Sequence, residues 1–526
     1  MQDKNYYIMD LPSYEGEEPY IFVSYSHNDI VKVREILKRI DKEKFRFWYD
    51  DTMEIGEDFR LELQSKIENC SAVLLFVSDN SMQSKYCGME IIVAYKNNKR
   101  IFPVFLDDNT EIPGALKMVL ENLQHVKGIA LESDTKYIDK LIDSLPTETM
   151  RSFSIEDDVL VRCKDGSDKL TVPAGVRVIG KGAFKNCEKL EALDVGETVE
   201  VMMSEACRGC KRLKQLTLPE NVRSVGESAF RDCTSLTSLV VKNDEIELGE
   251  RAFENCAKLE DIILADGISE IYGGVFNSCK ALSAIRLPNE LTVLGESSFA
   301  DCVSLKAIDI PEQVTKIDDM VFNGCLSLED VSIKNKVTKI GKYAFKDCKS
   351  LEEITIPDSV MSIGIGPFRG CNELKRIHVD AKNRFFKSVD DVLFNKNKSV
   401  LVSYPPLKDG ARYEVPDSVT TVSAWAFCDC EQLSEIIIPD SVTDIGEGAF
   451  YQCTKLKSIS IPDSVNRIDD TAFRGCTELE SVSIPASVTE FGWGVFNGCD
   501  KVRVICPKDS AAAKYCEKKN ILHTEN

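Results

Sequence analysis

Between residues 20 and 145, short runs of consecutive apolar residues alternate with stretches in which apolar residues recur every three or four positions. Strands are predicted at YIFVS (20–24), FRFWY (45–49), AVLLFVS (72–78) and IFPVFL (101–106). Helices are predicted near 28–40, 58–69 and 83–97, and a last strand and helix follow. Asn28 or Asp29 is expected to cap the first helix. Apolar strands separated by helices predict a five-stranded parallel sheet with helices on both faces.

In sheets of this kind, ligands bind beyond the carboxyl ends of the strands. This rule points to three loops, at residues 24–28, 50–58 and 79–84. Ser81 and Ser84, in or beside the third loop, are expected to cap helices, because no His/Asp pair accompanies them as in a serine nucleophile.

Further along the chain the pattern changes to a unit of 23 residues, P-x-x-V-x-x-I-G-x-x-A-F-x-x-C-x-x-L-x-x-I-x-I, as in Pro439–Ile461. Thirteen cysteines lie on this grid, at positions 187, 210, 233, 256, 279, 302, 325, 348, 371, 430, 453, 476 and 499. Every step is 23 residues except that from 371 to 430, which is 59, or 23 plus an insertion of 36. Since one such unit cannot bury its apolar face alone, the period predicts a solenoid of about 13 repeats.

Within each unit, L-x-x-I-x-I predicts a short strand, and stacked strands would form a parallel sheet. A glycine stands four residues before the phenylalanine in eight copies, which suits a tight bend in the left-handed conformation. The cysteine column is expected to be packing, with one small buried side chain per coil. No metal site is predicted, because no Cys/His cluster has the spacing of a zinc site.

The net charge is −21 and the sequence pI is about 4.9, which argues against a nucleic-acid partner. The first twenty residues carry acids where a signal peptide needs a basic region and an apolar run. Stretches such as SAVLLFVS are far shorter than the ~20 residues that a membrane helix needs. We therefore expect a cytoplasmic protein with no membrane span.

The 23-residue unit resembles the leucine-rich repeats of the BspA-like type. SFSIEDDVLVRCKDGSDKLTVP resembles the opening hairpin of that family, and PKDSAAAKYCEKKNIL resembles its closing helix, with Ser510 as the cap. The resemblance implies a cap at 153–172, repeats at 173–505 with an irregular strand insertion at about 380–415, and a cap helix at 506–526.

The outward positions of the predicted repeat strands are free to vary. Val240 and Ile263 are apolar neighbours on this face, and Arg286 follows them in a column that is otherwise mostly polar. They are the candidate recognition patch for a protein or other ligand, and the alternative is an indifferent surface.

The N-terminal loops also carry a resemblance. YIFVSYSHND, FRFWYDDTMEIGEDF and VLLFVSDNSMQSKYCGMEIIVAY resemble, in order and spacing, the three signature boxes of Toll/interleukin-1 receptor (TIR) domains. The resemblance implies a flavodoxin-like TIR domain at 1–148, with its core at about 19–145.

TIR domains that act as enzymes cleave NAD⁺ with a glutamate in the pattern S-x-W-C-x-x-E. Here the pattern is represented by Ser84, Tyr86, Cys87 and Glu90, with Tyr86 where the family usually has tryptophan. The resemblance implies Glu90 as the catalytic residue. On a helix, Tyr86, Cys87 and Glu90 share one face, because they are four and three residues apart.

The resemblance further implies a substrate pocket lined by Tyr25, Ser26, Tyr49 and Asp50. The loop with Gly56 resembles the mobile loop that packs against a neighbouring TIR domain to complete the site. Breaking the bond between nicotinamide and ribose leaves positive charge on the sugar, which a carboxylate stabilises. NAD⁺ would be the substrate, no cofactor is implied, and the product would be ADP-ribose or a cyclic form of it.

Together, the two resemblances predict an NAD⁺ glycohydrolase that is controlled by TIR self-association and by recognition or scaffolding through the repeats. The organisation resembles bacterial immune receptors in which recognition by a repeat domain brings TIR domains together. The alternative is a non-enzymatic adaptor or host-directed decoy that binds TIR partners and uses the repeats as a scaffold.

Overall fold

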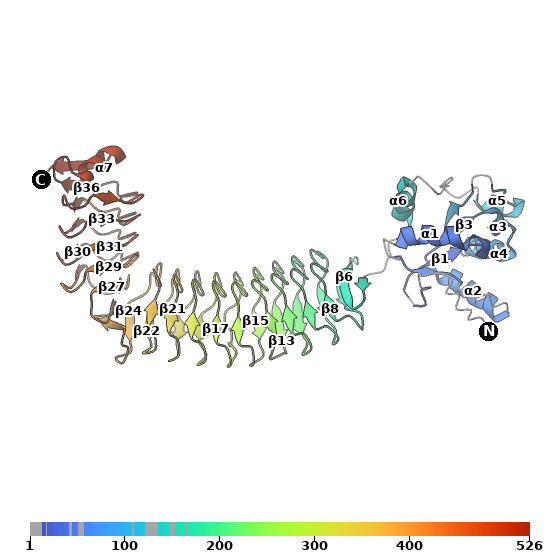
Figure 1. Ribbon diagram of the computed structural model, residues 1–526, viewed down its shortest axis with the longest axis horizontal. Coiled ribbons are helices and arrows are strands. Elements are labelled where there is room, and N and C mark those ends of the chain that lie inside the picture. The colour runs from blue at the N-terminus through green and yellow to red at the C-terminus, as the bar shows by residue number, and fades with distance from the viewer. Residues whose placement is uncertain are drawn as a thin grey trace. The chain divides into compact units, whose positions relative to one another are not determined.

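The chain forms two compact units, residues 1–154 with 163–165, and residues 155–162 with 166–526 (Figure 1). The computed structural model describes residues 13–16, 18–41, 45–50, 57–107, 110–120, 135–146, 153–163 and 166–525.

The N-terminal unit is built on a parallel sheet with the strand order β2-β1-β3-β4 in its described part. Its strands are β1 (Ile21–Ser24), β2 (Phe47–Trp48), β3 (Ala72–Val77) and β4 (Arg100–Phe105). Its helices are the 3-10 turn η1 (His27–Asp29), α1 (Ile30–Asp41), α2 (Glu57–Asn69), α3 (Asp79–Gln83), α4 (Lys85–Lys96), α5 (Gly114–Leu120) and α6 (Thr135–Ser144). The predicted fifth strand lies outside the described residues.

Each face of this sheet has its own apolar core, because side chains alternate along a strand. Ile21, Val23 and Tyr25 point to one face, where they pack with α1 and α6. Tyr20 and Phe22 point to the other face, where they pack with α2, α4 and α5. The predicted two-sided covering is therefore present.

The predicted cap of the first helix is wrong. Ser26 stands at the start of η1 and makes no side-chain cap, and Asp29 is buried within the turn. The Asp29 carboxylate instead accepts hydrogen bonds from the Ser78 hydroxyl and, at 2.7 Å, from the Asn80 amide. Tertiary partners thus replace the local cap.

In the second unit, the strands of successive coils form two series of parallel ladders, each divided into several sheets, where the prediction had one sheet (Figure 1). Residues 283–288 form no strand, so the coil that contains them contributes none to the first series. The predicted L-x-x-I-x-I strands are β7 (Lys169–Thr171), β9 (Ala192–Asp194), β11 (Gln215–Leu218), β13 (Ser238–Val241), β15 (Asp261–Ile263), β18 (Ala307–Asp309), β20 (Asp330–Ser332), β22 (Glu353–Ile356), β24 (Arg376–Val379), β28 (Arg412–Glu414), β30 (Glu435–Ile437), β32 (Ser458–Ser460), β34 (Ser481–Ser483) and β36 (Arg503–Cys506). The second set comprises β8 (Val178–Ile179), β10 (Val201–Met202), β12 (Ser224–Val225), β14 (Glu247–Leu248), β16 (Glu270–Ile271), β17 (Val293–Leu294), β19 (Lys316–Ile317), β21 (Lys339–Ile340), β23 (Ser362–Ile363), β29 (Thr421–Val422), β31 (Asp444–Ile445), β33 (Arg467–Ile468) and β35 (Glu490–Phe491).

Additional elements cover the two ends of the array. Strands β5 (Phe153–Glu156) and β6 (Val159–Cys163) lie side by side before the first coil. Helix α7 (Ala511–Lys519) follows the last coil, and the final strand β37 (Leu522–Glu525) pairs with β36. The Ser510 hydroxyl accepts a hydrogen bond from the Ala513 amide at 3.2 Å, which confirms Ser510 as the cap.

The cysteine column is packing, as predicted. All twenty cysteines are free thiols, and those of the column are buried except the half-buried Cys187. Most of them donate to a carbonyl 26 residues earlier, as Cys210 does to Phe184 at 3.0 Å. Beside them the phenylalanines stack, with centroids 5.3 Å apart for Phe230 and Phe253. Burial of each ring contributes about 1.5–3 kcal/mol.

The predicted role of the glycine column is wrong. None of its eight glycines has the positive φ that was expected. A Cβ on Gly226 would lie 2.5 Å from the Ser204 amide nitrogen, and one on Gly341 would lie 2.4 Å from the Asp318 carbonyl carbon. These glycines let the backbones of successive coils approach closely. The left-handed residues instead form two other columns at the same period, as Ser228, Arg251 and Gly274 show in one of them.

The insertion forms the expected irregular strand unit. Strands β25 (Phe386–Val389), β26 (Val392–Asn395) and β27 (Val400–Ser403) pair antiparallel in that order. Tyr404 then stacks on Phe427 with centroids 5.2 Å apart, so a coil without the cysteine begins the second part of the array.

Contacts across the insertion hold the two parts of the array together. The Arg369 guanidinium lies 3.5 Å from the centroid of the Trp425 ring and 5.4 Å from that of Tyr451. Trp425 is only 6% exposed and fits against Gly366 and Gly448. A cation over a desolvated aromatic ring contributes roughly 1–2 kcal/mol, so this contact fixes the junction locally.

Gly341→Ala should destabilise the solenoid by about 1–3 kcal/mol, because the added methyl group would overlap the backbone of the preceding coil. Thermal unfolding followed by circular dichroism measures the effect. Gly166→Ala is the control, since its nearest neighbour beyond the adjoining residues would be the Lys189 Nζ atom at 3.9 Å. Equal melting temperatures for the two variants would show that the column does not set the coil spacing.

Candidate functional site

The site begins where β1 ends. Alternation along the strand places Ser24 on the face of Phe22, which is the face that α4 covers. Ser24 is 1% exposed, and its hydroxyl donates a 2.5 Å hydrogen bond to the Glu90 carboxylate. The contact joins residues that lie 66 positions apart in the chain. Ser24 was not among the predicted site residues.

Glu90 is half-buried on α4, and its environment favours the protonated form. Burial raises the pKa of its carboxyl group from 4.5 to about 8. The hydrogen bond from Ser24 acts in the opposite direction, because it stabilises the charged form. The nearby negative charge of Asp50 raises the pKa further. The predicted residues Glu90 and Asp50 therefore lie close enough for their charges to interact.

The start of α4 sets the direction of Glu90. Ser84 is the helix cap, and its hydroxyl accepts a hydrogen bond from the Cys87 amide at 3.3 Å. Cys87 is buried, while Tyr86 is 40% exposed. On the helical wheel Glu90 lies between them, so its carboxylate sits at the boundary of core and solvent. Burial raises the pKa of the Cys87 thiol to about 12, which leaves it unreactive at neutral pH.

Two other predicted residues face away from Glu90. Tyr25 and Tyr49 pack in the core on the α1 side of the sheet. The Tyr25 hydroxyl donates to the Asp50 carbonyl at 3.2 Å, which steadies the end of β2. Ser26 is half-buried, and its carbonyl accepts the Asp29 amide at 2.8 Å. The predicted residue Gly56 lies outside the described residues.

A second buried cluster connects two of the loops at this edge of the sheet. Asp29 follows β1, and its partners Ser78 and Asn80 follow β3. Ser78 and Ser81 also form the reciprocal cap of α3. Ser81 and Ser84 are therefore helix caps, as predicted. The cluster fixes the α3 segment that precedes α4.

On the solenoid, the candidate recognition residues lie on successive coils. Val240 on β13 pairs in register with Ile263 on β15. Val240 is half-buried and Ile263 is 62% exposed. Arg286 is exposed and forms an ion pair with Asp266 at 2.9 Å.

In the described part of the chain, no group of three or more His, Cys, Asp or Glu side chains could hold a metal ion. None of the helices described there is long and apolar enough to cross a membrane.

Comparison with family models identifies both units. The model for the BspA type leucine rich repeat region matches residues 154–283, 269–400 and 411–515. The chain belongs to this family. A TIR domain model matches residues 21–142, so the BspA-type repeats follow a TIR domain.

Comparison with solved structures finds other leucine-rich repeat proteins. A leucine-rich cell surface protein from Faecalibacterium prausnitzii is 25% identical, with a TM-score of 0.52 over 71% of this chain and 92% of that one. A leucine-rich repeat protein from Bacteroides ovatus is 27% identical, with a TM-score of 0.43 over 68% of this chain and 83% of that one. Comparison with curated proteins gives no match.

The raised pKa of Glu90 has a consequence for stability. Between pH 4.5 and about 8 the folded protein holds a proton that the unfolded chain releases, so ionisation of Glu90 destabilises the fold as pH rises. Glu90→Gln should therefore raise the melting temperature at about pH 9 and have little effect at about pH 4.

The control for this measurement is Glu111→Gln, which changes an exposed glutamate of the same unit. Its effect should not differ between the two pH values. A larger stabilisation by Glu90→Gln in acid than in alkali would contradict burial as the cause of the shift.

Proposed function

We propose that the TIR domain is an NAD⁺ glycohydrolase, which cleaves the bond between nicotinamide and ribose to give nicotinamide and ADP-ribose or a cyclic form of it. The observation that carries the proposal is the position of Glu90. It lies next to the carboxyl end of β1, hydrogen-bonded to Ser24, at the edge of the sheet where α/β folds bind ligands.

In this reaction Glu90 acts as a carboxylate. As the bond breaks, positive charge develops on the ribose ring, and a negative group in a desolvated site stabilises it. Nicotinamide leaves as a neutral molecule, so no strong acid is required. Ser24 is a positioning residue, because its hydroxyl orients the Glu90 carboxylate and favours the ionised form. Water, or the adenine or ribose of the substrate, then captures the cation.

Self-association of TIR domains would complete the site. Four exposed apolar side chains on α4 support this step, and they are Tyr86, Met89, Ile92 and Tyr95. Apolar surface of this kind is typical of regions that bind another protein. Gly56 and its loop would contribute from the neighbouring domain. The repeats would bind the trigger and bring copies of the chain together, in bacterial immune signalling within the cytoplasm.

The alternative is an adaptor or host-directed decoy without catalysis. The apolar surface of α4 serves that role equally well, because an adaptor also needs a face that binds other TIR domains. The difference lies in Glu90: only the enzyme requires a desolvated carboxylate there. The two functions therefore separate on substitution of this one residue.

Purified full-length protein should release nicotinamide from NAD⁺, more rapidly per molecule at high protein concentration or with a crowding agent. Glu90→Gln should lower kcat/KM by at least about 100-fold, which corresponds to roughly 2.7 kcal/mol of lost electrostatic stabilisation. Glu111→Gln is the matched control and should keep full activity. Absence of release under every condition would favour the adaptor, and equal release by Glu90→Gln would remove Glu90 from the reaction.

The pH dependence should follow the ionisation of Glu90. Since the carboxylate is the active form, kcat/KM should rise as pH increases through about 8. Ser24→Ala should move this rise to higher pH, because the lost hydrogen bond stabilised the charged form. Ser65→Ala, an exposed change on α2, should not move it. A rate that falls with rising pH would mean that Glu90 acts as an acid.

A further inference from the structure

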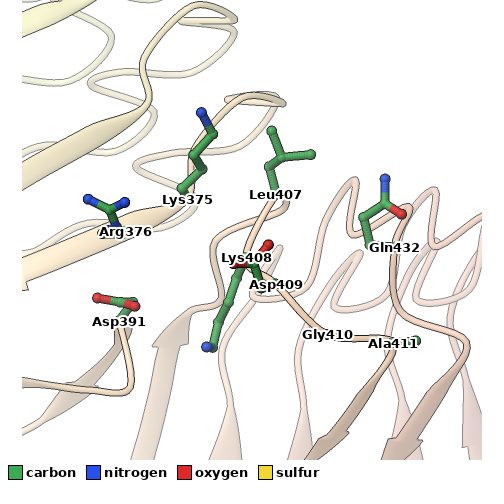
Figure 2. A pocket seen from close by; sticks show the side chains of 9 residues that line it. All are labelled: Lys375, Arg376, Asp391, Leu407, Lys408, Asp409, Gly410, Ala411 and Gln432. Carbon is green, nitrogen blue, oxygen red and sulfur yellow. The ribbon is translucent and has the colours of Figure 1, made fainter.

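The junction in the solenoid contains a cavity of about 530 Å³. Its lining comes from three parts of the chain. Lys375 precedes β24, and Arg376 is the first residue of that strand. Leu407–Ala411 form the loop before β28, and Gln432 belongs to the following coil. Asp391 closes one side from the turn between β25 and β26. Figure 2 shows the loop of Lys408 and Asp409 between the strand with Arg376 and the coil with Gln432. The volume lies within the range of small-ligand sites.

The strand ladder is interrupted beside this cavity. Strand β24 ends the sheet that it forms with β22, and β28 begins the next sheet. One coil later in that sheet, the Ser434 amide donates to the Ala411 carbonyl at 2.8 Å. Ala411 lies one repeat before Ser434, so its amide would donate in the same way to a strand placed before β28. Neither it nor the Gly410 amide donates a hydrogen bond to a described residue.

Free edge groups of this kind bind an added strand. An extended chain that enters the gap can accept hydrogen bonds from the loop before β28 and complete the interrupted ladder. The β24 edge is partly occupied, because the Ile377 amide donates to the Asp391 carbonyl at 3.1 Å. The added strand would therefore pair mainly with the β28 side.

The charges of the lining favour an anionic occupant. The lining holds three cations, Lys375, Arg376 and Lys408, and two carboxylates, Asp391 and Asp409, in a chain whose overall charge is −21. Lys408 forms no ion pair within the described residues. Lys375 and Arg376 pair with the exposed Glu352 and Glu353 at 2.8 and 3.3 Å. Such surface pairs contribute little, so an incoming carboxylate can compete for both cations.

Other ligand classes fit the lining less well. None of the nine lining residues is aromatic, so a sugar ring or a base finds no flat apolar surface to stack on. The lining does provide one apolar side chain, an amide and unpaired backbone donors. These groups match the side chains and the main chain of a peptide.

We propose that this cavity binds a short acidic peptide segment in extended conformation, by strand addition at the β28 edge and by ion pairs with Lys375, Arg376 and Lys408. The site is separate from the outward face with Val240 and Ile263. It is also independent of catalysis in the TIR domain.

The test uses full-length protein and a fluorescein-labelled hexapeptide of alternating valine and glutamate, titrated by fluorescence anisotropy. The acidic peptide should bind, and the same peptide with lysine in place of glutamate should not. Lys375→Glu combined with Lys408→Glu should weaken binding at least about tenfold. Methylation of alternate backbone nitrogens of the peptide should weaken binding when these nitrogens face β28, because the methyl groups block strand pairing.

Lys214→Glu is the matched control, because Lys214 holds the place of Lys375 seven coils earlier, where the ladder is continuous and the lysine likewise pairs with a glutamate of the preceding coil. It should leave binding unchanged, and the melting temperatures of all variants should equal that of the wild type. Three results would overturn the proposal: no binding of the acidic peptide, equal weakening by the control, or equal competition by inorganic phosphate or maltotriose.

Discussion

The hydrogen bonding of each coil to the next, 23 residues along the chain, is the interaction on which most of this molecule depends. Backbone hydrogen bonds between coils repeat along the array. Examples are those from the Lys214 amide to the Glu191 carbonyl at 3.0 Å and from the Lys457 amide to the Ser434 carbonyl at 3.2 Å. The stacked phenylalanines and the cysteine thiols fill the space that these bonds enclose. Every coil is thus stabilised by its neighbours, and the two ends need the cap strands and α7.

In the TIR domain, burial stabilises the fold at apolar side chains but destabilises it at one residue. Glu90 occupies a helix position whose neighbours Cys87 and Ile91 are buried, and a carboxylate there costs stability. Ser24 offsets part of this cost with a hydrogen bond. An ionisable group whose pKa is shifted by burial is typical of sites where chemistry takes place.

The repeat, its strands, the role of its cysteines and the helix cap at Ser510 could be predicted from the sequence, because each follows from a local pattern. The glycine column could not. The sequence shows that a small residue is required, and only the stacked coils show that the reason is backbone contact rather than a positive φ. The partners of Glu90 and Asp29 also escaped prediction, since they join loops that are far apart in the chain and meet only at the sheet edge. The alternation that places Ser24 on the face of Phe22 was visible in the sequence, but its meeting with α4 was not.

The insertion at the junction also affects how the solenoid comes apart. Single ladders are interrupted elsewhere in the array, but between Phe368 and Tyr404 both ladders and the aromatic stack are interrupted together, so the cooperative coupling that passes from coil to coil is weakest there. The Arg369–Trp425 contact and hydrogen bonds such as that from the Leu407 amide to the Leu374 carbonyl at 2.9 Å contribute the coupling that remains. Under heat or mechanical load the array would therefore yield as two blocks rather than one. Binding at the junction that strengthened or weakened this contact would change how far local unfolding at one end of the array spreads to the other.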